Sequence, residues 1–147
     1  MAGGERTAEP VLAFPGGLLA KSLFEEARYC FVYGQFLATI HLGLAYLEIT
    51  LAALFYGIGG RDDLKRANLT DLLKEALDQN WITLVEFNDL ERIRKNRNRV
   101  THFRRPGHPD SLEYQAVTAK EAFYGIIEQD ATAVMTACFG MIARNAV

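Results

Sequence analysis

Arginine, asparagine and histidine occur at helical spacing between residues 97 and 102. Arg97 and Asn98 are adjacent, and His102 follows Asn98 by four residues. Because a helix has about 3.6 residues per turn, Asn98 and His102 share a face, and Arg94 lies one turn before Asn98. A guanidinium can bind two phosphate oxygens, an amide can donate a hydrogen bond, and an imidazole can exchange a proton near neutral pH. These groups predict a site that acts on a phosphodiester.

Positive charge surrounds this predicted site. The 147 residues contain 16 Lys and Arg and 18 Asp and Glu, which gives a net charge of −2. Seven of the bases lie within fourteen residues that contain no acid: Arg92, Arg94, Lys95, Arg97, Arg99, Arg104 and Arg105. One basic patch on an acidic chain suits a localised anion site. We expect Arg94, Arg99, Arg104 and Arg105 to bind an RNA backbone or a nucleotide phosphate; the alternative is a solvated helix face.

Arg97 also has a structural interpretation. It falls near the centre of the inward stripe of a predicted helix, where another apolar residue is expected. That stripe consists of Phe87, Leu90, Ile93 and Val100. A buried guanidinium needs a carboxylate or a phosphate, because an unpaired buried charge is strongly unfavourable. Glu48 is the candidate for a structural ion pair, so this pairing and a catalytic role for Arg97 both stay open. His102 could likewise bind the terminal carbonyls of its helix.

Helical periodicity dominates the chain and determines where these residues lie. The expected helices span residues 17–33, 35–56, 70–79, 83–102 and 118–144. Ser22, Thr83 and Thr118 each precede a glutamate by three residues, as in the capping box at a helix start. No convincing two-residue alternation occurs, which argues against a sheet. We expect an all-α, up-and-down bundle of about five helices, with a flexible leader at residues 1–17 and one domain at residues 18–147.

The second predicted helix is apolar enough to suggest a membrane span. His41 and Glu48 lie within it, and an isolated carboxylate is costly inside a bilayer, so a central buried helix is the better interpretation. The second and fifth helices are apolar over most of their circumference, which favours a dimer interface on some of that surface. Cys30 and Cys138 are too few for a disulfide framework. We expect a cytoplasmic protein with no metal, no other cofactor and no membrane partner.

The stretch Arg97-Asn98-Arg99-Val100-Thr101-His102 resembles the signature of HEPN domains. That signature is an arginine, a polar residue and a histidine after four to six intervening positions. A helical bundle, a long apolar second helix with an embedded acid, and a motif near the end of a later helix are also typical of bacterial HEPN-like proteins. The resemblance covers roughly residues 22–144. It implies metal-independent RNA cleavage in the active members, at a site shared by two subunits, whereas other members bind or regulate.

The resemblance therefore implies a homodimeric, metal-independent endoribonuclease of the toxin or defence type, with a nucleotidyltransferase-like antitoxin as a candidate partner. In this scheme His102 transfers protons, Arg97 stabilises the phosphorane and Asn98 positions His102. One motif supplies only one histidine, whereas a two-fold axis near this helix supplies two. The alternatives are a non-catalytic HEPN-like module that binds a nucleotide, RNA or a partner protein, and a purely structural helical dimer held by Arg97 and Glu48.

Overall fold

The computed structural model describes the backbone of residues 14–101 and 123–145, and the side chains of residues 14–95 and 124–144. Within these residues all regular structure is helical, which confirms the predicted all-α class. The α-helices are α2 (Gly17–Val32), α3 (Phe36–Ala52), α4 (Leu69–Asp78), α5 (Leu84–Thr101) and α7 (Phe123–Asn145). A π-helical turn at Ala53–Ile58 continues α3, and a short 3₁₀ turn at Asp62–Leu64 precedes α4.

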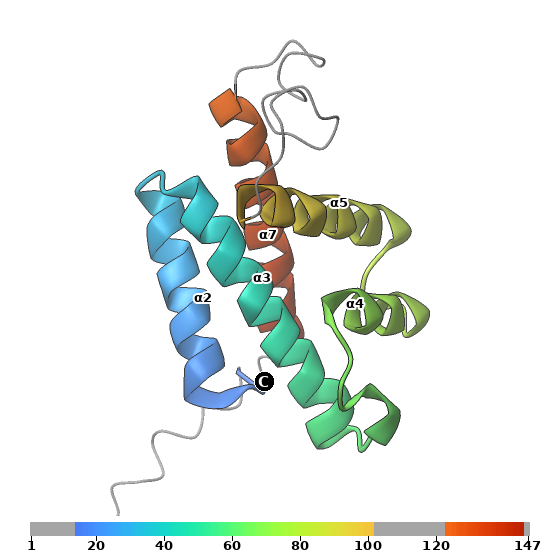
Figure 1. Ribbon diagram of the computed structural model, residues 1–147. Helices are drawn as coiled ribbons and strands as arrows, with labels where there is room; N and C mark the ends of the chain where they lie inside the picture. Colours follow the sequence, from blue (N-terminus) through green and yellow to red (C-terminus); the bar gives the residue numbers. More distant parts are fainter. Residues whose placement is uncertain (1–13, 102–122, 146–147) are drawn as a thin grey trace, which may run out of the picture.

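The long helices α2, α3 and α7 lie side by side (Figure 1). Helix α2 runs antiparallel to α3, whereas α7 runs in the same direction as α3. Helices α4 and α5 lie across this layer, and α5 contacts α3, α4 and α7. The bundle is confirmed, and the crossing of α5 is the feature that a regular up-and-down arrangement does not include. It brings the end of α5 to the layer formed by α3 and α7.

Two reciprocal caps fix the starts of α4 and α5. The predicted capping box at Thr83 is confirmed: the Glu86 amide donates to Thr83 Oγ1 at 3.1 Å, and the Thr83 amide donates to Glu86 Oε1 at 2.8 Å. A second box, not predicted, begins α4, where the Asp71 amide donates to Asn68 Oδ1 at 2.9 Å. Each cap satisfies amides that the first helical turn leaves unpaired.

The predicted helix bounds agree well with the structure. The first, third and fourth predicted helices begin and end within one residue of α2, α4 and α5. The predicted cap at Ser22 is wrong, because α2 already begins at Gly17 and Ser22 lies in its second turn. The predicted fifth helix matches α7 from Phe123, and its expected start at Thr118 lies outside the described residues.

Helix α3 forms the centre of the core and packs closely on α7. Leu44 and Tyr46 on α3 are fully buried. At Gly43 an added Cβ would lie 2.3 Å from Val134 Cγ1, so only glycine allows this approach of α3 to α7. The buried Cys138 thiol donates to the Gly43 carbonyl oxygen at 3.5 Å, and burial raises the pKa of Cys138.

The core also includes a residue that precedes the first helix. Phe14 is buried, and its ring lies 5.8 Å from that of Phe24 and 6.3 Å from that of Tyr46, measured between centroids. The expected leader at residues 1–17 therefore ends too late, because Phe14 already belongs to the folded domain. Burial of its aromatic ring provides the driving force for this packing.

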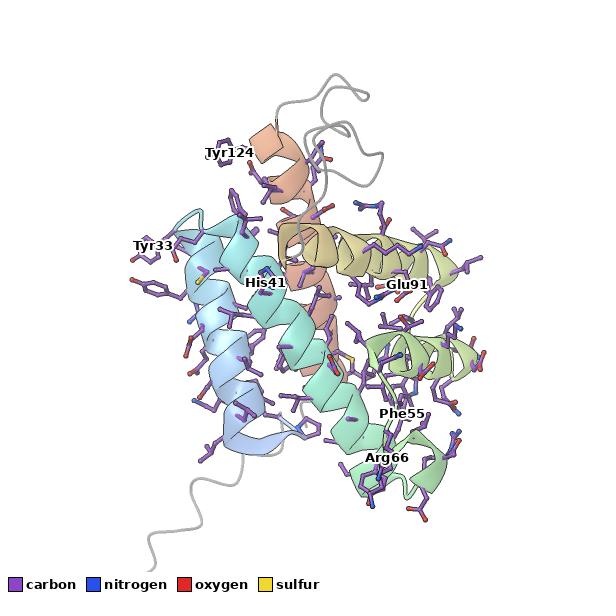
Figure 2. The ribbon with its side chains drawn as sticks, viewed as in Figure 1. Tyr33, His41, Phe55, Arg66, Glu91 and Tyr124 are labelled. Carbon is purple, nitrogen blue, oxygen red and sulfur yellow. The ribbon has the colours of Figure 1, made fainter. Side chains whose placement is uncertain are left out.

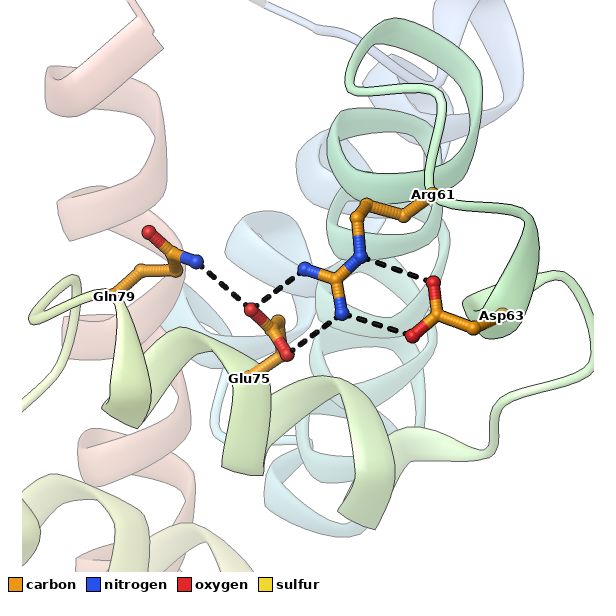
Figure 3. Close-up of polar contacts among 4 residues, drawn as sticks. All are labelled: Arg61, Asp63, Glu75 and Gln79. Carbon is orange, nitrogen blue, oxygen red and sulfur yellow. Dashed lines mark hydrogen bonds and ion pairs between the residues drawn. The ribbon is translucent and has the colours of Figure 1, made fainter.

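A cluster of four residues holds the connection before α4, and we call it the Arg61 cluster (Figure 3): Arg61, Asp63, Glu75 and Gln79. The Arg61 guanidinium donates to both carboxylate oxygens of Asp63 and to both of Glu75, at 2.9–3.2 Å. Gln79 Nε2 donates to Glu75 Oε2 at 2.9 Å. These bonds to Arg61 lower the pKa of the Asp63 and Glu75 carboxyls. The cluster thereby ties the connection to α4.

Two helical segments of the described chain are long and apolar enough to cross a membrane. They are Phe36–Ile58 and Tyr124–Arg144, with mean hydropathies of 1.6 and 1.2. The central helix of a soluble protein has the same length and composition. This property therefore does not distinguish a membrane span from a core helix.

Candidate functional site

Helix α5 divides into an acidic half and a basic half. Glu86, Asp89 and Glu91 lie in the first half, and Arg92, Arg94, Lys95, Arg97 and Arg99 follow. This order is favourable for the helix dipole, because acids stabilise the amino-terminal end and bases the carboxyl-terminal end. The helix is continuous through Thr101. Positive charge therefore accumulates toward the end of α5.

The predicted motif lies at this end. The backbone of Arg97, Asn98 and Arg99 is helical as expected, and their side chains lie outside the described part of the structure. His102, Arg104 and Arg105 also lie outside the described residues. The helical backbone thus bears out the expected helical setting of Arg97 and Asn98, while the contact of either residue with His102 stays a prediction.

Arg92 anchors α5 to α7 through an aspartate that the sequence analysis missed. Arg92 Nη1 lies 2.7 Å from Asp130 Oδ1, and Asp130 is only 2% exposed. The Arg92 side chain is half exposed. Asp130 follows Glu128 and Gln129 in the sequence, but it shares the face of α7 that carries the buried Ile127 and Val134. A carboxylate in an apolar helix indicates a partner on a neighbouring element.

Arg94, predicted to bind substrate, has a carboxylate partner on its own helix. Arg94 Nε and Nη2 donate to the two carboxylate oxygens of Glu91 at 3.1 and 3.3 Å. Thr70 Oγ1 of α4 donates to Glu91 Oε2 at 2.9 Å, and Figure 2 shows Glu91 on the side of α5 that faces α4. Arg94 therefore takes part in the packing of α5 on α4. Lys95 is exposed.

Glu48 and His41 lie two turns apart on α3. Glu48 is half buried and makes no hydrogen bond or ion pair with any side chain that the structure describes. Its expected partner, the Arg97 guanidinium, is outside the described side chains, so the ion pair stays a prediction. His41 is half buried on α3, beside the end of α5 in Figure 2, and α3 contacts α5. A second imidazole thus lies on the helix next to the motif.

Two hollows beside the described side chains of α5 do not suit a nucleotide phosphate. One, of about 140 Å³, lies between α5 and α7 and includes the acidic side chains of Glu86 and Asp89 in its wall. Another, of about 50 Å³, is mainly apolar and is bordered by Glu86 and Arg144. The first has the wrong charge and the second is too small. Among the described residues, no group of three or more His, Cys, Asp or Glu could hold a metal ion.

The arrangement concentrates positive charge toward the end of α5. Arg92 holds this helix on α7, and Glu91, the partner of Arg94 on the same helix, accepts a hydrogen bond from Thr70 of α4. The bases that follow lie further along the chain. A cationic helix end of this kind can attract and orient an anion. Comparison of the chain with protein-family models, with curated proteins and with solved structures finds no match.

Proposed function

We propose that this protein is a metal-independent endoribonuclease of the HEPN type, with Arg97, Asn98 and His102 at its active site. The observation that carries the proposal is the position of the motif. Arg97 and Asn98 lie in the last two turns of a capped, continuous helix whose second half holds bases and no acid. His102 follows that helix directly. A cationic helix end with an imidazole suits the cleavage of a phosphodiester.

The ion pairs of Arg92 and Arg94 support this assignment because they separate arginines with a carboxylate partner from the bases that follow. Asp130 and Glu91 largely compensate the charges of Arg92 and Arg94. Lys95, Arg97, Arg99, Arg104 and Arg105 follow with no acid among them in the sequence. These later bases are therefore the ones we assign to the RNA backbone. Phosphate contacts of this kind supply affinity without reading the base sequence.

The reaction needs two proton transfers. A base removes the proton of the ribose 2′-hydroxyl, whose oxygen attacks phosphorus, and an acid protonates the departing 5′-oxygen as its bond to phosphorus breaks. The products are a 2′,3′-cyclic phosphate and a free 5′-hydroxyl. Arg97 stabilises the charge of the phosphorane, Asn98 positions His102, and His102 transfers protons. A homodimer supplies the second His102, which is why we include a second copy in the proposal.

An RNA digestion in the presence of a chelator tests the proposal. Substitution of His102→Ala removes the proton-transfer group and is expected to abolish cleavage while leaving the thermal unfolding temperature nearly unchanged. His108→Ala is the matched control, because it removes another imidazole from the segment between α5 and α7. It is expected to cleave at the original rate, with a cyclic phosphate on the product.

Three results would overturn the assignment. Cleavage by His102→Ala at the original rate would remove that residue from the mechanism. RNA binding that weakens steeply with salt, without cleavage by the natural protein, would indicate the binding module instead. An Arg97→Met variant that gains stability and keeps all binding would indicate a structural arginine paired with Glu48. A nucleotidyltransferase-like antitoxin is the partner that we propose for the ribonuclease, and its addition is expected to suppress cleavage.

A further inference from the structure

The outer surface of α2 exposes an unusual number of large apolar side chains. We call it the α2 outer face, and it comprises Leu18, Leu19, Tyr29, Val32 and Tyr33, which are 75%, 60%, 59%, 65% and 66% exposed. Helix α2 lies at the edge of the molecule in Figure 1, and its contacts are with α3 and α7. The opposite face carries the buried residues Ala20, Phe24, Ala27 and Cys30. Exposed apolar surface of this kind marks an interaction site.

The exposed positions follow the spacing of a helix that pairs with another helix. Leu18, Ser22, Glu25, Tyr29 and Val32 succeed one another at alternating steps of four and three residues. This is the spacing of the seam between two packed helices. The rings of Tyr29 and Tyr33 already contact each other, with centroids 4.6 Å apart. A preformed aromatic pair offers a large contact area at little cost in side-chain entropy.

Charged and aromatic residues border this seam on both sides. Lys21 and Arg28 lie along one edge, and Glu26 and Tyr33 lie along the other. In a parallel pair of helices, the edge with Lys21 and Arg28 faces the edge of the partner that carries Glu26 and Tyr33. Each base then lies next to the residue five positions further along the partner's helix. Lys21 then faces Glu26 of the partner subunit, and Arg28 faces the ring of Tyr33 of the partner subunit.

We propose that the α2 outer face binds a second copy of this chain, with the two α2 helices parallel. Lys21 attracts a carboxylate in this arrangement, and Arg28 lies over an aromatic face, which is also favourable. An antiparallel pair would bring Lys21 and Arg28 of the two chains together and Glu26 close to its own copy, and both contacts are repulsive. The charges therefore favour a second copy of this chain with its α2 helix parallel to the first.

The polar centre of the seam sets the strength of this contact. Lys21 Nζ lies 3.0 Å from Glu25 Oε2, so part of the charge of Glu25 is compensated within its own helix. Ser22 and Glu25 nevertheless contribute little apolar area between the two ends of the seam. A polar residue in a helix seam lowers affinity and fixes the register. The dimer is accordingly expected to dissociate on dilution.

Size-exclusion chromatography with light scattering, over a range of protein concentrations, tests the interface. The natural chain is expected to shift from monomer to dimer as concentration rises. Tyr29→Glu places a carboxylate opposite its own copy in the seam and is expected to abolish the dimer. Circular dichroism and thermal unfolding verify that the exposed substitution leaves the fold intact.

A charge reversal and its rescue test the direction of packing. Glu26→Lys turns the attraction with Lys21 of the partner subunit into a repulsion at two symmetric positions, so the dissociation constant should rise several-fold. Addition of Lys21→Glu to Glu26→Lys restores opposite charges and is expected to restore the dimer. Asp78→Lys makes the same change in charge at an exposed position of α4 and is expected to leave association unchanged.

The remaining outcomes each contradict the proposal. A chain that stays monomeric at all concentrations has no such interface. If neither Tyr29→Glu nor Glu26→Lys changes the state of association of the chain, the copies associate through another surface, such as the site that two His102 residues would share. A monomer that binds lipid vesicles, and loses that binding with Tyr29→Glu, uses this face on a membrane instead. The α2 outer face does not include α5, so each of these results leaves the ribonuclease proposal to be judged by RNA cleavage.

Discussion

Two of the settings in which arginine occurs in this molecule contrast: singly, between two carboxylates beside α4, and repeatedly, along the last half of α5. The Arg61 guanidinium shares its donors between Asp63 and Glu75 in a compact cluster (Figure 3). Two acids, Asp62 and Asp63, follow Arg61 directly in the sequence. Residues 92–105 instead contain seven bases and no acid. The two regions therefore differ in the number of carboxylates available to each guanidinium.

This difference distinguishes cations that hold the fold from cations that can bind a ligand. Arg92 and Arg94 resemble Arg61, because Asp130 and Glu91 compensate them. The Arg92 pair joins α5 to α7, and the Arg94 pair lies within α5, where Glu91 also accepts a hydrogen bond from Thr70 of α4. The bases after Lys95 exceed the acids nearby in the sequence, and accumulated like charge favours an anionic partner. Position along α5 thus separates the two roles within one helix.

The largest expected effect is the loss of RNA affinity when bases that follow Lys95 are removed. A variant with Arg97→Ala and Arg99→Ala should bind RNA much more weakly, and the logarithmic dependence of its affinity on salt should become shallower by about two. Arg61→Ala is the control and should leave both quantities unchanged. Fluorescence anisotropy with a 2′-O-methyl RNA, which cannot be cleaved by this route, measures both. Equal losses in the two variants would show that total charge, rather than location, determines binding.

Removal of the buried Asp130 carboxylate should lower stability and leave RNA affinity unchanged, the reverse of the effect expected for Arg97 and Arg99. Asp130→Ala is expected to lower the free energy of unfolding by about 2 kcal/mol, because a charge-assisted hydrogen bond to Arg92 is lost. Glu128→Ala removes an exposed carboxylate from the same helix and should change stability little. Urea unfolding of both variants measures the difference. Weaker RNA binding by Asp130→Ala would contradict a purely anchoring role.

The sequence predicted the fold well where local spacing determines the structure. Apolar residues at helical intervals predicted five helices, and the hydroxyl and carboxylate of Thr83 and Glu86 predicted the start of α5. Ser22 has the same local pattern, but α2 extends past it because Ala20 packs in the core. The burial of Phe14 depends on Phe24 and Tyr46, which no local pattern relates to it. Tertiary packing decides such positions.

In the candidate site too, local spacing could be predicted and tertiary packing could not. The motif at Arg97 and Asn98 could be placed on a helix because its spacing is local. Asp130 could not be assigned to Arg92, because 38 residues separate them and the crossing of α5 over α7 brings them together. The dimer interface expected on residues 35–56 and 118–144 stays a prediction. Exposed large apolar side chains are most numerous on α2, and others lie on α3, α5 and α7. Apolar composition alone does not reveal which face of a helix is covered.

The smallest expected effect concerns the pH dependence of the Arg61 cluster. Arg61 lowers the pKa of the Asp63 and Glu75 carboxyls, so their contribution to stability is present above the ordinary carboxyl pKa and is lost as pH falls through the lowered values. Arg61→Met removes this contribution and should unfold at a lower temperature than the natural protein near neutral pH. The side chains of Arg61 and Asp63 are more than a third exposed, so solvent keeps the difference small. Thermal unfolding from neutral pH to about pH 3 should show the two melting temperatures converging. A difference that stayed constant with pH would mean that Arg61 acts through packing of its side chain and not through its charge.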